Sequence, residues 1–406
     1  MTSFGISPQL SVWRTLLALA VVFVMLATTG WTAQHTHRES TALRSSLSAW
    51  VRDSVHGRPL PDPARTAPAK LARFFGSLTP YDRHDLATRY PLAVGNMNGA
   101  PVSLRYEANR VALERERDVE SRRVHDNRLS TAGQQDAVRR MHRYEALMRP
   151  ERHILAFDPE GSGRIAEVFG DLRRAQRISV VVPGVDTDLL TFEKSYRPYS
   201  APVGMAKSLY SAERQAAPST RTAVIAWADY TAPAGLGVDA ATAMRAVDGA
   251  VRLNALLRAL PGRAEVSMFC HSYGSVVCGV AAPAMPRRVS DIAVAASPGM
   301  RAASAAHLNR TARVWAMRDA TDWVQDVPYL EVGGLGHGAD PVSRAFGARV
   351  LSSRDARGHA GYFQPGTDSL RNLAEVGVGA YGSVTCARGD EACRAGVPDA
   401  PAAGRA

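Results

Sequence analysis

One short stretch of the chain combines residue types that could carry out nucleophilic chemistry. Residues 266–282 read VSMFCHSYGSVVCGVAA, so an apolar, β-branched run gives way within CHSYGS to small residues of helical character. A sharp turn from strand to helix strains its central residue and lifts that side chain above the carboxyl edge of a sheet. Cys270 and Gly274, two residues to either side of Ser272, are small enough to avoid clashes. Ser272 is therefore the candidate nucleophile; the alternative is a chance serine in an ordinary turn.

A serine hydroxyl is a poor nucleophile until a base removes its proton. On a turn of this kind the chain order is serine, then an acid, then a histidine. We expect His359, in RGHAGYF directly before a predicted last helix at 368–377, to be the base. His337, in the glycine-rich GGLGHGADP, is the alternative, and His307 is expected on the surface. His271 adjoins the serine but should point elsewhere, because the turn is so tight.

The acid that orients the base should follow the predicted strand at 313–317. Asp319, Asp322 and Asp326 all qualify by position. We favour Asp322, because the apolar pair that follows it could anchor the loop on the core. Asp319 is the alternative, and the remaining carboxylates of the loop are expected to be solvated.

A developing oxyanion needs two backbone N–H donors. Tyr273, directly after the nucleophile, should supply one of them. Gly184 lets the loop after ISVVVPG turn close to the site, so Val185 or Asp186 should supply the other. Asp186 and Asp188 are two nearby carboxylates without a histidine, which is a weak metal signal. We therefore expect no metal and no cofactor.

The elements around these residues indicate an α/β fold. A hairpin is predicted where HILAFD and RIAEVFG flank the turn residues PEGSG. Buried strands are predicted from continuous apolar runs at 178–183, 223–227, 266–270, 292–297 and 313–317. Helical stretches such as 239–260 lie between them. This alternation predicts a mostly parallel central sheet with helices on both faces, preceded by a helical region.

The expected organisation has six parts. They are a cytoplasmic N-terminus at 1–14, a transmembrane anchor or signal sequence at 15–33, a linker or stalk at 34–70, a helical N-terminal region at 71–150, the α/β domain at 151–377 and a C-terminal tail at 378–406. Four prolines at 56–70 indicate the linker. Thr79 with Asp82 predicts a helix start, and 102–149 shows helical spacing typical of a solvated amphipathic helix or helical pair.

The segment Thr15–Ala33 has 19 residues and no charge. Trp13 and Trp31 would stand roughly 27 Å apart on a helix, close to the hydrocarbon thickness of a bilayer. Tryptophans at that separation are typical of interfacial anchors. We favour a single-pass anchor with the catalytic domain outside the cell, and a cleaved signal peptide with a secreted domain is the alternative. The flanking charges orient the segment weakly, so a cytoplasmic domain remains a further alternative.

The composition bears on partners and on the cysteines. The formal net charge is +11, from 46 arginines and three lysines against 38 acidic residues. No basic tract is interleaved with aromatic residues, so we expect no nucleic-acid partner. Cys270 and Cys278 are expected to be small buried hydrophobic residues. A disulfide between Cys386 and Cys393 is plausible in an oxidising compartment. The oligomeric state is not indicated.

Six blocks of the sequence together resemble an actinobacterial α/β-hydrolase family of unknown function. The blocks are FFGSLTPYDRHDLATRYPLAVGNMNGAPVSLRYEANR, RHILAFDPEGSGRIAEVFGDL, ISVVVPGVDTD, FCHSYGS, GLGHGADP and GHAGYF, which occur in this order between Leu71 and Gly377. The resemblance implies an α/β-hydrolase fold and a triad of Ser272, Asp322 and His359. The family usually has glycine where this chain has Cys270. The resemblance implies no substrate.

Two functions follow from these features. The first is a membrane-anchored or secreted serine hydrolase that cleaves a small-molecule or lipid ester through an acyl-enzyme. The second is a binding or scaffold protein at the cell surface, with a hydrolase fold and a disabled site. Cys270 and the long helical N-terminal region favour the second. Fold alone does not choose between them.

Overall fold

The computed structural model describes residues 41–309, 311–390 and 393–398. These described residues belong to one compact unit. Its centre is an eight-stranded sheet with the order β12-β9-β8-β7-β5-β6-β4-β3. The strands are β3 (His153–Asp158), β4 (Arg164–Gly170), β5 (Arg177–Val182), β6 (Thr222–Ala228), β7 (Glu265–His271), β8 (Val289–Ala295), β9 (Arg313–Met317) and β12 (Arg349–Val350).

The sheet is mostly parallel. All neighbours from β12 to β6 run parallel, and β4 pairs antiparallel with both β6 and β3. The hairpin and the five buried strands predicted from apolar runs are therefore confirmed. Val182 of β5 lies beside Cys270 of β7, so these two strands end together at the carboxyl edge of the sheet. Loops that leave this edge can meet one another, as ligand-binding loops of open α/β sheets do.

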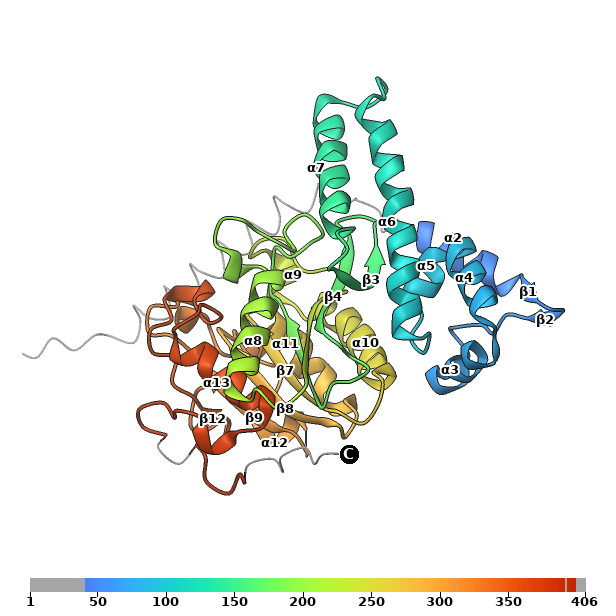
Figure 1. The fold of residues 1–406 in the computed structure, drawn as a ribbon. Helices are drawn as coiled ribbons and strands as arrows, with labels where there is room; N and C mark the ends of the chain where they lie inside the picture. The colour runs from blue at the N-terminus through green and yellow to red at the C-terminus, as the bar shows by residue number, and fades with distance from the viewer. Residues whose placement is uncertain (1–40, 310, 391–392, 399–406) are drawn as a thin grey trace, which may run out of the picture. The chain divides into compact units, whose positions relative to one another are not determined.

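Helices cover both faces of the sheet. One face is packed by α8 (Pro202–Ala216) and α13 (Asp368–Val378), which Figure 1 shows in front of the strands. The other face is packed by α10 (Met244–Ala259) and α11 (Gly274–Ala281). Alternate strand residues serve the two faces: Val181 and Phe269 pack with the first pair, Met268 with the second. This two-sided burial explains why the parallel strands are continuously apolar.

A helical region precedes the sheet, as predicted. Its helices are α2 (Thr41–Val51), α3 (Pro68–Ser77), α4 (Pro80–Arg89), α5 (Pro91–Gly95), α6 (Val102–Val124) and α7 (Thr131–Leu147). The start of α4 is a capping box, in which Thr79 and Asp82 satisfy each other's backbone N–H groups. Asn109 of α6 donates to the Ile154 carbonyl at 2.9 Å and so joins the region to the sheet.

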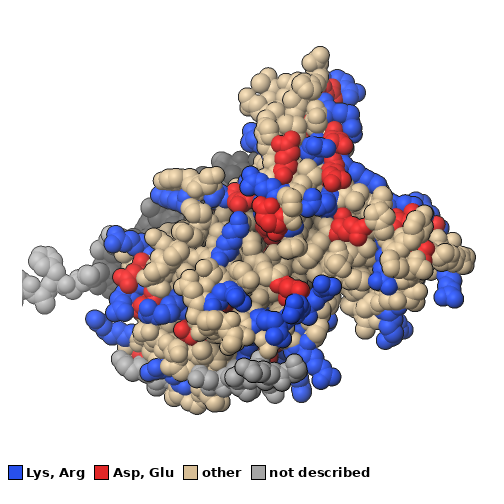
Figure 2. Space-filling model, viewed as in Figure 1, with Lys and Arg blue, Asp and Glu red and all other residues tan. Residues whose placement is uncertain are grey.

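The paired helices α6 and α7 extend away from the sheet as a hairpin (Figure 1). Basic and acidic side chains both occur along it (Figure 2). Buried residues such as Ala112, Leu113 and Tyr144 face the core. The solvated helical pair predicted from the charge pattern is therefore confirmed.

The described part of the expected linker at 34–70 is packed rather than extended. Trp50 is fully buried, and its Nε1 donates to the Pro61 carbonyl at 2.8 Å. Leu60 joins the same apolar cluster, and the small hairpin of β1 (Ser54–Val55) and β2 (Arg58–Pro59) lies between them. Prolines thus shape a compact connection here, because apolar residues on both sides of them find a common core.

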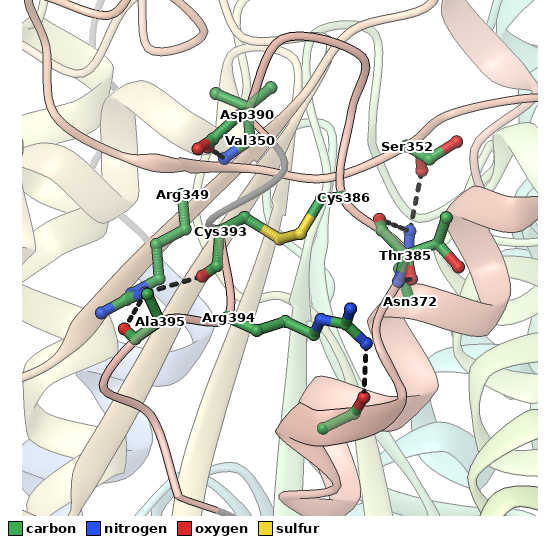
Figure 3. Close-up of a disulfide and its surroundings, with 11 residues drawn as sticks. Arg349, Val350, Ser352, Asn372, Thr385, Cys386, Asp390, Cys393, Arg394 and Ala395 are labelled. Carbon is green, nitrogen blue, oxygen red and sulfur yellow. Dashed lines mark hydrogen bonds between the residues drawn. A yellow bond between two sulfur atoms is a disulfide. The ribbon is translucent and has the colours of Figure 1, made fainter.

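The described part of the chain after α13, which ends at residue 398, also packs on the sheet instead of forming a free tail. Cys386 and Cys393 form a disulfide, and Arg349 of β12 donates to the Cys393 carbonyl at 2.6 Å (Figure 3). Asp390 accepts from the Val350 N–H at 2.8 Å, so the disulfide loop covers the edge strand. A covered edge cannot pair with another chain.

The expected membrane segment at 15–33 lies outside the described residues. Among the helices that the structure does describe, none is both long and apolar enough to cross a membrane. The remaining short elements are α9 (Val238–Ala241), α12 (Ala305–Leu308), β10 (Glu331–Val332) and β11 (Leu335–Gly336), with five 3-10 turns: Pro198–Ser200, Ala282–Ala284, Trp323–Asp326, Gly358–Ala360 and Tyr381–Ser383.

A glutamate is buried between α8 and the sheet. Glu213 accepts a hydrogen bond from Ser179 of β5, and its second oxygen has no partner among the described residues. Burial raises the pKa of Glu213 to about 8, from an ordinary value of 4.5. The folded protein therefore holds this carboxyl neutral at pH 7, whereas the unfolded chain ionises it. Unfolding releases a proton between these values, so stability falls as the pH rises from 4.5 to 8.

Replacing Glu213 with glutamine should remove this loss. We compare the free energy of unfolding of Glu213→Gln with that of the wild type at each pH. This difference should increase in favour of the variant by about 3 kcal/mol from pH 5 to pH 8, because each unit of pKa shift is worth about 1.4 kcal/mol. Urea unfolding at several pH values measures the difference. Glu151→Gln, at an exposed position, is the control. Parallel stability curves for Glu213→Gln and wild type would contradict the prediction.

Candidate active site

Ser272 lies on the turn between β7 and α11. Its φ is +54°, a left-handed conformation that residues other than glycine rarely adopt. The Ser272 N–H donates to the Ala295 carbonyl of β8 at 3.0 Å, which holds the turn against the neighbouring strand. A Cβ on Gly274 would lie 2.2 Å from the Val182 carbonyl oxygen, so a side chain there is excluded. The sharp, strained turn predicted for this position is thus present.

Cys270 and Cys278 form a disulfide across this turn. The prediction that they are merely small buried residues is wrong, although both are buried. Strand, turn and helix fold back within eight residues and bring the two Cα atoms to 6.5 Å. That separation lies within the range that a disulfide can bridge. The residue that departs from the expected glycine thus ties β7 to α11 around Ser272.

Three side chains that the sequence singled out come together at the carboxyl edge of the sheet. His359 Nε2 lies 2.8 Å from Ser272 Oγ. On the other side of the ring, His359 Nδ1 lies 2.9 Å from Asp322 Oδ1. The three residues come from the turn after β7, the loop after β9 and the loop before α13. This geometry allows the imidazole to take a proton from the serine while the carboxylate holds its Nδ1–H.

Asp322 is fully buried and held by several donors. Tyr362 OH donates to its Oδ2 at 2.7 Å, and the Val324 N–H donates to its Oδ1 at 3.0 Å. Burial disfavours the charged form, but the hydrogen bonds from His359, Tyr362 and Val324 outweigh it and keep the pKa of Asp322 below its usual range. The carboxylate is therefore ionised at pH 7 and can stabilise a protonated imidazole.

His271 has a positioning role that the sequence did not indicate. Burial, and then the neighbouring His359, lower the pKa of His271 to about 4. The Nε2 of this neutral ring lies 2.6 Å from the His359 carbonyl. A carbonyl only accepts, so this nitrogen carries the hydrogen. His271 thus fixes the backbone of the residue that contacts Ser272.

The alternative base and acid are engaged elsewhere. His337 is buried, and its Nε2 contacts the Ala240 carbonyl at 2.7 Å. Asp319 Oδ1 accepts from the N–H groups of Thr321 and Gly358, both at 3.0 Å. Asp319 therefore ties the acid loop to the His359 loop and makes no hydrogen bond to the imidazole.

His307 and Asp326 lie outside the site. The ring of His307 is exposed and bonds to Ser304 at 2.6 Å. Asp326 is also exposed, at the end of the 3-10 turn that follows Asp322. Both positions match the solvated roles expected of them.

The loop after β5 brings backbone donors close to Ser272. A Cβ on Gly184 would lie 2.6 Å from the Ser272 Cβ, so only glycine allows this approach. The Asp186 N–H donates to the Pro233 carbonyl at 2.9 Å and is therefore occupied. The Val185 and Tyr273 N–H groups find no acceptor in the described part of the chain. Of the two residues proposed for the second donor, Val185 thus keeps a free N–H.

The carboxylates of this loop brace its backbone. Asp186 accepts from the Gly235 N–H at 2.7 Å, and Asp188 accepts from the Thr191 N–H at 2.7 Å. Within the ranges that the structure describes, no group of three or more His, Cys, Asp and Glu side chains could hold a metal ion. The role of both aspartates in this structure is therefore to shape the loop.

A cavity of about 320 Å³ opens onto Ser272. Its lining is mainly apolar and includes Val185, Tyr273, Val324 and Val327. Trp323 lines it as well, and its ring centroid lies 4.7 Å from that of His359. A larger cavity of about 900 Å³ lies apart from Ser272, between the N-terminal helices and α10. Of these two cavities, only the smaller one is lined by Ser272.

Comparison with known proteins supports this architecture. Residues 158–332 match the model of a family described as alpha/beta hydrolase. The matched range contains Ser272 and Asp322 and ends before His359. Together with the strand order, the match identifies an α/β-hydrolase fold and favours a hydrolase.

The curated relatives are uncharacterized proteins. Two from Mycobacterium tuberculosis, strains CDC 1551 / Oshkosh and H37Rv, are each 27% identical over 378 residues, which covers 79% of this chain. The alignment covers 57% of their own length, so the chain spans little more than half of these relatives. They supply no activity.

Solved structures of hydrolases show a weak likeness. A dienelactone hydrolase from Anabaena variabilis is 18% identical with a TM-score of 0.33, over 54% of this chain and 90% of that one. An α/β serine hydrolase without a lid, from Xanthomonas campestris, is 12% identical with a TM-score of 0.31, over 56% and 94%. At these values no substrate can be transferred to this chain.

Proposed function

We propose that this protein is a serine hydrolase that cleaves a carboxylic ester. The observation that carries the proposal is the 2.8 Å contact between Ser272 Oγ and His359 Nε2, with Asp322 on the far side of the ring. A hydroxyl, an imidazole and a buried carboxylate in this order form the constellation that activates serine in hydrolases on unrelated folds. The cavity beside Ser272 gives a substrate access to the hydroxyl.

The reaction proceeds in two halves. Ser272 Oγ attacks the acyl carbon while His359 Nε2 takes the hydroxyl proton, and the N–H groups of Val185 and Tyr273 stabilise the negative oxygen. His359 then gives the proton to the leaving alcohol, and the acyl group stays on Ser272. A water molecule, deprotonated by His359, attacks the acyl-enzyme, and His359 returns this proton to Ser272 Oγ as the acid leaves. Asp322 holds the imidazole in the required tautomer throughout.

The cavity favours an ester with an apolar group. Its volume of about 320 Å³ is at the small end of ligand pockets, which span roughly 300–1,000 Å³. The lining includes Leu236, Val324, Val327 and Pro328 and contains no Asp, Glu, Lys or Arg. Burial lowers the pKa of the one histidine in the lining, His337, and so favours its neutral form. Transfer of a charged group into such a lining is unfavourable.

We further propose that the domain acts outside the cytoplasm, anchored by residues 15–33 or released after their cleavage. The two disulfides support this location, because disulfides persist mainly in oxidising compartments. The uncharged segment itself supports membrane contact.

A fluorophosphonate probe tests the catalytic role of Ser272. The probe phosphonylates activated serines, so the folded full-length protein should be labelled on the peptide that contains Ser272, as read by mass spectrometry. Heat-denatured protein and Ser272→Ala should stay unlabelled, because neither presents an activated hydroxyl. Folded wild-type protein that takes up no probe would favour the alternative of an inactive scaffold.

A further inference from the structure

Exposed apolar side chains gather around the mouth of the cavity at Ser272. Of the thirteen large apolar side chains exposed in the described part of the chain, six lie in two short segments, 236–238 and 323–335. We call this set the rim: Leu236, Val238, Trp323, Leu330, Val332 and Leu335. Leu236 and Trp323 also line the cavity, although they are 69% and 43% exposed. The rim is therefore continuous with the catalytic cavity.

The two segments of the rim are joined to each other. Thr242 forms a β-bridge with Leu335, so the loop around α9 meets the hairpin of β10 and β11. The hairpin turns at Gly333 and Gly334, both with positive φ, and presents Val332 and Leu335 on either side of its tip. A solvated hairpin tip needs no apolar residues for folding. Contiguous exposed apolar surface of this kind marks an interaction site.

Two ion pairs lie in or beside these segments, whereas Asp326 of the second segment is exposed and forms no ion pair among the described residues. Arg245 lies 2.9 Å from Asp239, and Arg301 lies 2.7 Å from Glu331. Each pair cancels its own charge, which lowers the cost of bringing this surface against a phase of low dielectric constant. The rim thus combines apolar side chains with two internally neutralised ion pairs at the opening of an apolar cavity.

We propose that the rim docks on a lipid surface and takes its ester from that phase. The inference rests on the proposed function for the substrate and on the rim itself for docking. A protein seated on the rim would close the cavity that the substrate must enter. A lipid surface does the opposite, since the molecules it contains can move directly from the contacted layer into the cavity. Apolar side chains that enter the boundary of the acyl chains supply the affinity.

Trp323 offers a direct measurement of docking. Full-length Ser272→Ala protein is mixed with phosphatidylcholine vesicles whose acyl chains carry bromine near the headgroup, or with vesicles without bromine. The same measurement on Trp323→Phe in this background isolates the emission of Trp323 from that of the other tryptophans. Docking predicts that bromine quenches at least about half of the Trp323 emission, because the indole enters the interfacial layer.

A rim variant and a matched control make the test specific. The rim variant is Val238→Ser/Leu330→Ser/Val332→Ser, at positions that do not line the cavity. The control is Tyr81→Ser/Val119→Ser/Tyr196→Ser, at three exposed apolar positions outside the rim. Quenching of Trp323 should disappear in the rim variant and persist in the control. Any membrane contact by residues 15–33 is the same in both and does not affect the comparison.

Hydrolysis supplies the second readout. With Ser272 intact, the rim variant should hydrolyse a short, dissolved ester within roughly twofold of the wild-type rate, because the cavity is unchanged. Its rate on the same acyl group held in vesicles should fall at least about tenfold, since apolar area no longer enters the lipid.

Three outcomes separate docking from catalysis. Equal Trp323 emission with and without bromine would overturn docking, whatever the esterase activity. Alternatively, the wild type shows no quenching and forms a dimer that the rim variant converts to a monomer. That result would assign the rim to contact with a second copy of the chain and would also overturn lipid docking. Quenching of Trp323 without hydrolysis of either ester by wild type would overturn the proposed function and leave docking supported.

Discussion

Replacing Ser272 with alanine is expected to lower kcat for ester hydrolysis by about a million-fold. The expected loss is of the size measured when the nucleophile of a serine hydrolase is removed, because no acyl-enzyme can form. His359 keeps its place in the variant through the Asp322 contact and the hydrogen bond from His271 to its carbonyl. The rate on a dissolved p-nitrophenyl ester, with a circular dichroism spectrum to verify folding, measures the effect.

Ser275 provides the matched control on the same turn. Its hydroxyl is buried three residues further on and bonds to the Ser272 carbonyl and to Ser297, both at 2.6 Å. Ser275→Ala should lose some stability but less than about tenfold in kcat, because Ser275 Oγ makes no hydrogen bond to the imidazole. Similar losses in both variants would show that the turn needs its hydroxyl network, and would contradict a specific nucleophilic role for Ser272.

Replacing Asp322 with asparagine is expected to lower kcat by about ten-thousand-fold. An amide in place of Oδ1 offers the imidazole a donor as readily as an acceptor, so Nε2 can carry the proton and can no longer act as the base toward Ser272. The variant also loses the negative charge that stabilises the imidazolium during proton transfer. Folding should persist, because the amide oxygen that remains in place of Oδ2 can still accept from Tyr362.

Asp319→Asn distinguishes the two candidate acids. Asp319 lies three residues earlier on the same loop but bonds to Thr321 and Gly358 rather than to the imidazole. Loss of the Asp319 charge should weaken these hydrogen bonds and loosen the loop that carries His359. We expect kcat to fall by at most about tenfold, because only hydrogen bonds within the loops are affected. A larger loss in Asp319→Asn than in Asp322→Asn would overturn the assignment of the acid.

Local signals account for the parts of the site that the sequence predicted well. The turn at Ser272 lies between a strand-like apolar run and a helix-like run. The spacing of apolar side chains within each run predicts the element that the run forms. Gly184 was identifiable for a similar reason, since only glycine permits a close backbone approach after an apolar strand. Thr79 and Asp82 form their capping box within a single helical turn. At the Ser272 turn and at the capping box the interacting residues are neighbours in the chain, whereas Gly184 is identified by its residue type alone and approaches Ser272 from a distant part of the chain.

The sequence did not decide between candidate residues that lie close together in the chain. Asp319 and Asp322 share one loop, and the contact of Asp322 with the imidazole depends on the Tyr362 hydroxyl from a separate segment. Val185 and Asp186 are adjacent, and a hydrogen bond from Asp186 to Pro233 is what leaves Val185 as the free donor. The alternation of strands and helices in the sequence specifies neither contact, because each contact depends on the position of a loop that is distant in the chain.

Two features escaped the sequence entirely, for different reasons. The disulfide between Cys270 and Cys278 was not predicted, because apolar neighbours in the sequence are compatible with a free cysteine as well as with a disulfide-bonded one. The hydrogen bond from His271 to the His359 carbonyl joins residues 88 positions apart. Nothing within its own turn indicates such a partner.

By itself, the sequence determined the strands, the helices between them and the strained turn that carries Ser272, because these depend on side-chain period and on residue size within a few positions. Tertiary structure decided which histidine and which aspartate face that turn. Ser272 and His359 are 87 residues apart in the chain, and they come within 2.8 Å. That approach follows from the order of the strands, since parallel pairing brings the ends of β7 and β9 and the loop before α13 to one edge of the sheet.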